Sequence, residues 1–183
     1  NKMGILNFVK PDKIVLQKAT DFEANFEFRP LEPGYGVTIG NALRRVLLNS
    51  LEGYAIVGIN IVGADHEFAT IKGVTEDVTE LILNLKQVRI KKKVEHDINV
   101  EKITLSIKNK TEFTAGMIGE ASPSFEVMNP ELLICTMDTS AKLDIEISIG
   151  KGRGYVPAED HKDKSSHFGY IPVDAIYTPI KNV

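Results

Sequence analysis

Residues 31–48 read LEPGYGVTIGNALRRVLL, and the pattern of the chain changes within them from a turn to a helix. Two prolines and two glycines in residues 30–36 are the composition of a turn. Thr38 is predicted to be the N-cap of a helix that continues to Leu51, with Gly53 placed to end it. One face of this helix is apolar and is expected to be buried: Ile39, Ala42, Leu43, Val46 and Leu47.

A second face of the same helix carries Asn41, Arg44, Arg45 and Leu48. Two arginines beside a leucine are a common composition of protein interfaces, because guanidinium groups pair bidentately while leucine excludes water. An ordinary solvated helix face is the alternative, and composition alone favours that alternative.

Strands are predicted on both sides of this helix. Before it, Phe22–Arg29 alternates apolar and polar residues, and Lys13–Ala19 is its expected hairpin partner. After it, further strands are expected where apolar residues alternate: Ala55, Val57, Ile59 and Ile61; Ile103, Leu105 and Ile107; Leu143, Ile145, Ile147 and Ile149; and residues 171–177. A second helix is predicted over Thr75–Val88, with Glu76 and Asp77 in its first turn and a buried stripe of Val78, Leu81, Ile82, Leu85 and Val88. Two helices among about nine strands indicate an α+β fold.

Composition indicates a soluble globular protein. The chain has 183 residues, 43% of them hydrophobic, and a formal net charge of −3. No window has the length of a membrane span, and residues 1–8 do not resemble a signal peptide. The lone Cys135 fits a reducing compartment, so we expect a cytoplasmic protein. The chain has 22 basic and 25 acidic residues, so we do not expect a protein whose whole surface binds DNA.

A glycine-rich stretch, Gly150–Gly154, is the candidate for nucleotide binding. Its glycines and Lys151 resemble a phosphate-cradling loop, but residues 155–157 read YVP and do not begin a helix. The spacing also misses the dinucleotide-binding fingerprint. A turn that leaves a strand is the favoured interpretation, and a nucleotide-binding domain is kept as the alternative function.

Metal and catalytic sites are not expected. The histidines His66, His96, His161 and His167 lack the helical i, i+4 spacing of a zinc protease, and only His161 and His167, with Asp160 and Asp163, could meet in one loop. Cys135 lies in an apolar strand, and no nucleophile elbow is present. We therefore assign no catalytic residue, cofactor or metal.

The densest basic run consists of Lys86, Arg89, Lys91, Lys92 and Lys93. No aromatic residue is interleaved to stack on bases, so an acidic protein partner is favoured over nucleic acid.

Five ordered blocks resemble the bacterial RNA polymerase alpha subunit family. They are residues 31–48, His66-Glu67-Phe68, residues 73–86, residues 151–158 and residues 173–179, and together they cover essentially the whole chain. The resemblance implies a non-catalytic scaffold that dimerises and binds the polymerase beta and beta-prime subunits, without direct contact to DNA or membrane.

The resemblance also implies two lobes. A discontinuous α+β dimerisation lobe is expected over 1–52 with 178–183, and an inserted, mostly β lobe carrying one helix over 53–177. The family's dimerisation lobe continues for about fifty residues beyond the position of Val183, so we expect a weakened dimer or one that uses a different surface.

Positions that match the family's motifs imply the contact residues. The large-subunit interface is expected at Arg44, Arg45, Leu48, Glu80, Lys86 and Val173. The dimer and core face of the first helix is expected at Ile39, Leu43, Val46 and Leu47.

Overall fold

The computed structural model describes residues 9–161 and 168–183, and internal contacts divide the chain into two compact units. Unit 1 ends at Val46 and unit 2 begins at Leu47. Within the described residues there are three α-helices and twelve strands, which confirms the α+β class. The lobe boundaries expected from the family resemblance stay a prediction.

A β-hairpin is the main element of unit 1. It pairs β1 (Lys13–Ala19) with β2 (Ala24–Arg29) in antiparallel register, as predicted. Ile14 lies opposite Phe28 and Leu16 opposite Phe26, so these four apolar side chains form cross-strand pairs. Ile14, Leu16 and Phe26 are nevertheless exposed, and Phe26 is 62% exposed.

Helix α1 (Tyr35–Asn49) begins earlier than predicted and ends earlier. It starts directly after Gly34, whose φ of 89° closes the preceding turn, and the Tyr35 amide donates to the Glu32 carbonyl at 3.2 Å. Thr38 therefore lies inside the first turn, and its prediction as the N-cap was wrong.

The predicted burial of the α1 apolar face was also wrong. Among the residues that the structure describes, no α1 side chain is buried. Leu43 and Val46 are each 50% exposed, while Ile39 and Leu47 are intermediate. An amphipathic pattern predicts that a face can be covered, and in this single chain the described residues do not cover it.

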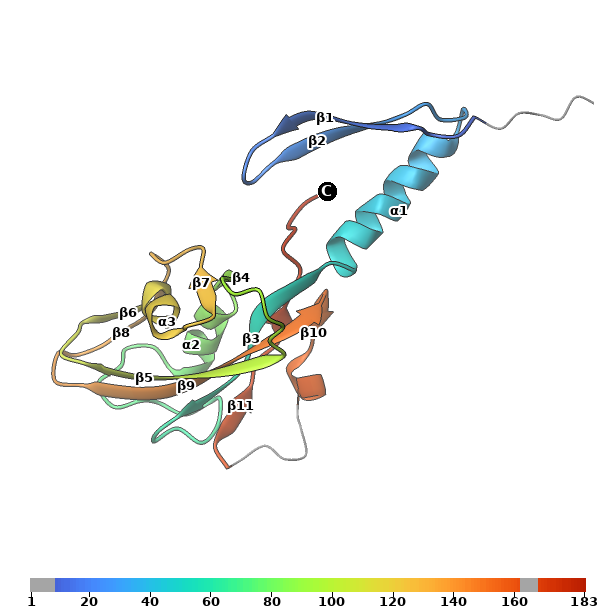
Figure 1. Cartoon of the computed structure of the whole chain (residues 1–183). Coiled ribbons are helices and arrows are strands. Elements are labelled where there is room, and N and C mark those ends of the chain that lie inside the picture. The colour runs from blue at the N-terminus through green and yellow to red at the C-terminus, as the bar shows by residue number, and fades with distance from the viewer. Residues whose placement is uncertain (1–8, 162–167) are drawn as a thin grey trace, which may run out of the picture. The chain divides into compact units, whose positions relative to one another are not determined.

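Unit 2 is built on a six-stranded sheet (Figure 1). Its strand order is β5-β9-β3-β4-β7, and β11 pairs with β3. The members are β3 (Glu52–Ile61), β4 (Ile90–Lys92), β5 (Val100–Lys108), β7 (Phe125–Val127), β9 (Lys142–Arg153) and β11 (Tyr170–Pro172). Two smaller sheets pair β6 (Glu112–Thr114) with β8 (Leu133–Thr136), and β10 (Tyr155–Val156) with β12 (Ala175–Ile176).

A β-bulge interrupts the alternation that the sequence predicted for β3. The register between β3 and β9 shifts between Ile56 and Gly58. Ala55 and Val57 consequently pack in a small cluster with Ala175 and Tyr177, whereas Ile59 and Ile61 lie in the main core. The bulge inserts one residue, so the side chains before and after it exchange faces of the sheet.

Helix α2 (Val78–Leu85) is shorter than the predicted 75–88 because Asp77 caps it. The Asp77 carboxylate accepts from the Glu80 amide at 2.8 Å, and the Glu80 carboxylate accepts from the Asp77 amide at 3.2 Å. Glu76 lies outside the helix and accepts from the amide and hydroxyl of Thr136. The predicted buried stripe is confirmed: Val78, Leu81, Ile82, Leu85 and Val88.

A third helix, α3 (Ala115–Ala121), was missed. Two of its seven residues are glycines, which are poor helix formers, but both lie where a side chain would pack tightly against a neighbour. A Cβ on Gly116 would lie 3.2 Å from Pro130, and one on Gly119 would lie 3.3 Å from Val127. The expectation of one helix after residue 52 was therefore wrong, since α2, α3 and a short 3₁₀ helix, η1 (Ala158–His161), all lie there.

The core of unit 2 is apolar and fully buried. α2 and α3 lie on one side of the sheet formed by β5, β9 and β3 (Figure 1). Side chains from both helices share one cluster with the strands, including Leu81, Ile118, Ile145 and Ile147. The last predicted strand, residues 171–177, is divided by Val173 and Asp174 into β11 and β12.

Candidate subunit interface

The first candidate surface is the arginine face of α1. Arg44 and Arg45 are exposed, and Leu48 is intermediate. Spacings of three and four residues place Leu48 on the same helix face as both arginines. The geometry of α1 therefore agrees with the face predicted from sequence.

The second candidate surface surrounds the C-terminal end of α2 in unit 2. The Lys86 ammonium lies 2.6 Å from the Asp174 carboxylate, and both side chains are largely covered. The other oxygen of Asp174 accepts from the Ala158 amide at 2.8 Å. The hydrogen bond from Lys86, then that from the Ala158 backbone, hold the pKa of Asp174 below its usual value. Lys86 thus reaches the surface in a fixed position.

Sequence reasoning did not single out Asp174 as the partner of Lys86. The two residues are 88 positions apart, and no local pattern connects them. The family block 173–179 contains Asp174, and this was the one signal that could have found it.

Glu80 and Val173 have structural roles in this chain. Glu80 is exposed but is held by the capping box at the start of α2. Val173 is 1% exposed and belongs to the main core, and its amide donates to the Val57 carbonyl at 2.9 Å. A buried side chain cannot touch a partner, so the prediction of Val173 as a surface contact is corrected: it supports the surface from beneath.

A hollow lies on the same side of unit 2. We call it the α2–β11 hollow; it has a volume of about 540 Å³ and is lined by residues that include Asp65, Glu67, Phe68, Leu83, Lys86 and Asp174. Phe68 is 76% exposed and Leu83 52%. Exposed apolar side chains rimmed by carboxylates are typical of a surface that contacts another protein. Helical spacing placed Leu83 outside the predicted buried stripe of α2, but sequence analysis did not recognise it as a candidate contact.

The glycine stretch 150–154 does not form a phosphate cradle. β9 continues through Gly150 and Gly152 to Arg153. A Cβ on Gly152 would lie 2.5 Å from the ring of Tyr177, and one on Gly150 would lie 2.8 Å from Val57. Because these two glycines have no Cβ, the side chains of Tyr177 and Val57 can pack directly against them. Gly154, with φ of 60°, forms the predicted turn after the strand. This geometry does not favour the nucleotide-binding alternative.

Several ammonium groups of the basic run bond to oxygen atoms of this same chain. Lys86 pairs with Asp174, the Lys93 ammonium donates to the Ser122 carbonyl at 3.0 Å, and the Lys92 ammonium donates to the His96 carbonyl at 3.3 Å. This arrangement does not favour nucleic-acid binding.

The remaining candidates for chemistry are Cys135 and the metal-ligating side chains. Cys135 is buried in β8, and burial raises the pKa of its thiol to about 12, which agrees with its interpretation as a small apolar residue. Within residues 9–161 and 168–183, no group of three His, Cys, Asp or Glu side chains could hold a metal ion. Asp163 and His167 of the loop candidate lie outside the described residues. No helix in the described ranges has the length and apolarity to cross a membrane.

Comparison with known families identifies the class. Residues 57–178 match the family model described as the RNA polymerase Rpb3/RpoA insert domain, and the chain belongs to this family. It is 60% identical over 181 residues to the DNA-directed RNA polymerase subunit alpha of Cytophaga hutchinsonii and 56% identical over 181 residues to that of Flavobacterium psychrophilum. The subunit of Chloroherpeton thalassium is 49% identical over 175 residues.

These relatives confirm the resemblance seen in the sequence blocks. The first two matches cover 99% of this chain and 54% of the relative, and the third covers 94% and 52%. The chain thus spans about half the length of the curated relatives it matches.

Proposed function

We propose that this chain acts as a non-catalytic assembly scaffold of bacterial RNA polymerase, corresponding to the first half of an alpha subunit. The observation that carries this proposal is the alignment of 99% of this chain with proteins named DNA-directed RNA polymerase subunit alpha. In this proposal the chain acts in the cytoplasm and carries no catalytic residue or cofactor.

The apolar face of α1 is the proposed dimer surface. Ile39, Leu43, Val46 and Leu47 follow one another at helical spacing; Leu43 and Val46 are each 50% exposed, and Ile39 and Leu47 are only partly buried. A contiguous apolar face of this kind is stabilised when a second copy removes it from water. Two copies would then present two arginine faces to the two large subunits.

The proposed large-subunit contacts come from both units. In α1 they are Arg44, Arg45 and Leu48. In unit 2 they lie around Lys86 and Glu80, beside the α2–β11 hollow, whose Phe68 and Leu83 offer apolar area for burial. Val173 supports this surface through packing.

Co-elution with the purified beta subunit tests the proposal. We expect the unmodified chain to co-elute, and Arg45→Ala to weaken binding by about 2 kcal/mol or more, roughly 30-fold in Kd, if Arg45 is a buried anchor of the interface. The matched control is Lys72→Ala, another exposed basic residue on a turn of unit 2, which should bind as the unmodified chain does.

Two results would count against the proposal. Equal binding by Arg45→Ala and Lys72→Ala would remove Arg45 from the interface. Failure of both this chain and a version extended beyond Val183 to bind either large subunit would overturn the scaffold assignment itself.

A further inference from the structure

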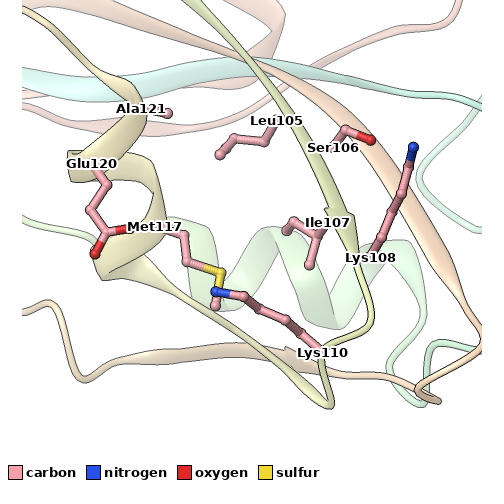
Figure 2. A pocket seen from close by; sticks show the side chains of 8 residues that line it. All are labelled: Leu105, Ser106, Ile107, Lys108, Lys110, Met117, Glu120 and Ala121. Atoms are coloured by element: carbon pink, nitrogen blue, oxygen red, sulfur yellow. The ribbon is translucent and has the colours of Figure 1, made fainter.

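A groove between β5 and α3 lies among residues that the proposed polymerase interface does not use. This β5–α3 groove has a volume of about 340 Å³. It is lined by Leu105, Ser106, Ile107, Lys108, Lys110, Met117, Glu120 and Ala121. Figure 2 shows Leu105 pointing from the strand toward α3, and Met117 pointing from α3 toward the strand. One wall is therefore a strand and the other a helix.

The strand wall is an edge of the main sheet. β5 pairs with β9 along its whole length without a register shift, and in the described residues it pairs with no other strand. Natural sheets protect a long regular edge, because its unpaired amides and carbonyls can accept another strand. β5 has nine residues and contains neither a proline nor a bulge.

The register shows which backbone groups face outward. The Lys151 amide donates to the Asn99 carbonyl, and Asn99 precedes β5. Because hydrogen-bonded and non-hydrogen-bonded pairs alternate in an antiparallel ladder, odd-numbered residues of β5 bond to β9. The amides and carbonyls of Thr104, Ser106 and Lys108 therefore point to the open edge, and the last two of these residues line the groove.

The side chains of the groove define the chemistry of its occupant. Leu105 and Met117 are half-buried and Ile107 is buried, which gives an apolar floor. Lys108 and Lys110 have no ion pair within the described residues, whereas Lys102, on the same strand, pairs with Glu146 at 3.3 Å. Glu120 is the single acidic residue in the lining. The groove thus has an apolar floor, with Lys110 extending toward Met117 at one end and Lys108 on the opposite face of β5, pointing away from α3 (Figure 2).

We propose that the β5–α3 groove binds an extended acidic segment of a partner protein, which adds to β5 as a further strand. Backbone groups of the segment bond to Ser106 and Lys108, and its alternate apolar side chains cover Leu105 and Met117. Carboxylates on the opposite face of the segment lie near Lys108, and one at its end lies near Lys110. This binding is additional to the proposed scaffold function and shares no residue with it.

The test uses a fluorescent hexapeptide of alternating glutamate and valine, titrated with the full chain and followed by anisotropy. We expect saturable binding that weakens about tenfold in the double variant Lys108→Glu/Lys110→Glu. Its control, Lys72→Glu/Lys181→Glu, makes the same change of charge at exposed positions outside the groove and should leave binding unchanged.

A backbone variant separates strand addition from simple charge attraction. Ser106→Pro and Ser106→Ala both lose the hydrogen bond that the Ser106 hydroxyl donates to Asp144 of β9 at 2.6 Å. Ser106→Pro alone also removes an outward amide, while the backbone bonds to β9 remain, so only this variant should weaken peptide binding, with the chain still folded. Val100→Pro is its control, because it lies on the same edge but outside the groove lining. Thermal unfolding of each variant shows whether its fold is retained.

Three results would overturn the proposal. The first is no saturable binding of the peptide up to about 1 mM. The second is equal binding by a lysine–valine peptide or tighter binding by a single-stranded oligonucleotide. The third is unchanged affinity in a folded Ser106→Pro chain.

Discussion

Unit 2 and unit 1 differ in what happens to their apolar side chains. In unit 2, Ile145, Ile147 and Ile149 of β9 alternate with polar residues and are all at most 1% exposed. In unit 1, Ile14 and Phe26 also belong to strands with apolar residues on one face, yet both are mostly exposed. The same kind of pattern predicts burial in both places, but among residues 9–161 and 168–183 only those of unit 2 supply a second layer of their own. The difference indicates that unit 2 is stabilised by its own core, and that the apolar faces of unit 1 are suited to association.

The largest effect is expected from the core of unit 2. Ile147→Ala removes a fully buried side chain from β9 and should lower the free energy of unfolding by about 2–5 kcal/mol. Denaturant unfolding of the purified chain measures this. A loss below about 1 kcal/mol would show that the core of unit 2 is not close-packed, and the comparison between the units would fail.

A smaller effect is expected from the cap of α2. Asp77→Ala removes one half of the capping box and should lower the free energy of unfolding by about 1 kcal/mol. The same denaturant measurement applies, with Asp12→Ala as the control at an exposed site before β1. If both variants unfold alike, the capping box contributes nothing measurable to unit 2.

The Lys86–Asp174 pair predicts a modest dependence of stability on pH. The pKa of Asp174 is lower in the folded chain than in the unfolded chain, where it is about 3.9. The pair therefore contributes stability above the unfolded pKa, and this stability is lost as the pH falls through the folded pKa. Both side chains are partly exposed, so we expect less than about 1 kcal/mol. In Asp174→Asn, the loss of stability between about pH 5 and pH 3 should be shallower than in the unmodified chain, as unfolding at each pH will show. An identical slope would mean that the pair is not formed in solution.

The smallest effect on stability is expected on α1. Leu43→Ala replaces a half-exposed side chain and should change the free energy of unfolding by no more than about 0.5 kcal/mol when the protein is dilute. At high concentration the same variant should associate less than the unmodified chain, measured by sedimentation. A loss of several kcal/mol in the dilute protein would place Leu43 in a core and contradict the exposure of α1.

Sequence reasoning succeeded where a local pattern and its tertiary partner lie in the same unit. The alternation of Leu143 and Ile145 and the helical stripe of Leu81 and Leu85 predicted buried positions, and all four are buried. The β1–β2 hairpin also followed from period-two alternation beside a short turn.

The failures have identifiable physical causes. The bulge at Val57 is set by pairing with β9, which is distant in sequence, so the alternation of β3 could not reveal it. α3 was missed because Gly116 and Gly119 lower helix propensity, and the close packing of both against Pro130 and Val127 is not visible in the sequence. Val173 was assigned to the surface by family resemblance, and a motif does not show which of its residues is buried. The burial predicted for Leu43 failed because amphipathicity does not identify what covers a helix.

Hydrogen–deuterium exchange, resolved along the dilute chain before and after addition of the beta subunit, tests the central claim most directly. Amides of β3 and β9 should be the slowest to exchange in the lone chain, while those of the hairpin and α1 exchange much faster. Addition of the beta subunit should then slow exchange around Arg44–Leu48 and leave β9 unchanged. The contrary result is exchange in α1 that is as slow as in β9 in the lone chain and does not change when the beta subunit is added. That result would contradict the claim that unit 1 offers a surface for assembly while unit 2 holds its own core.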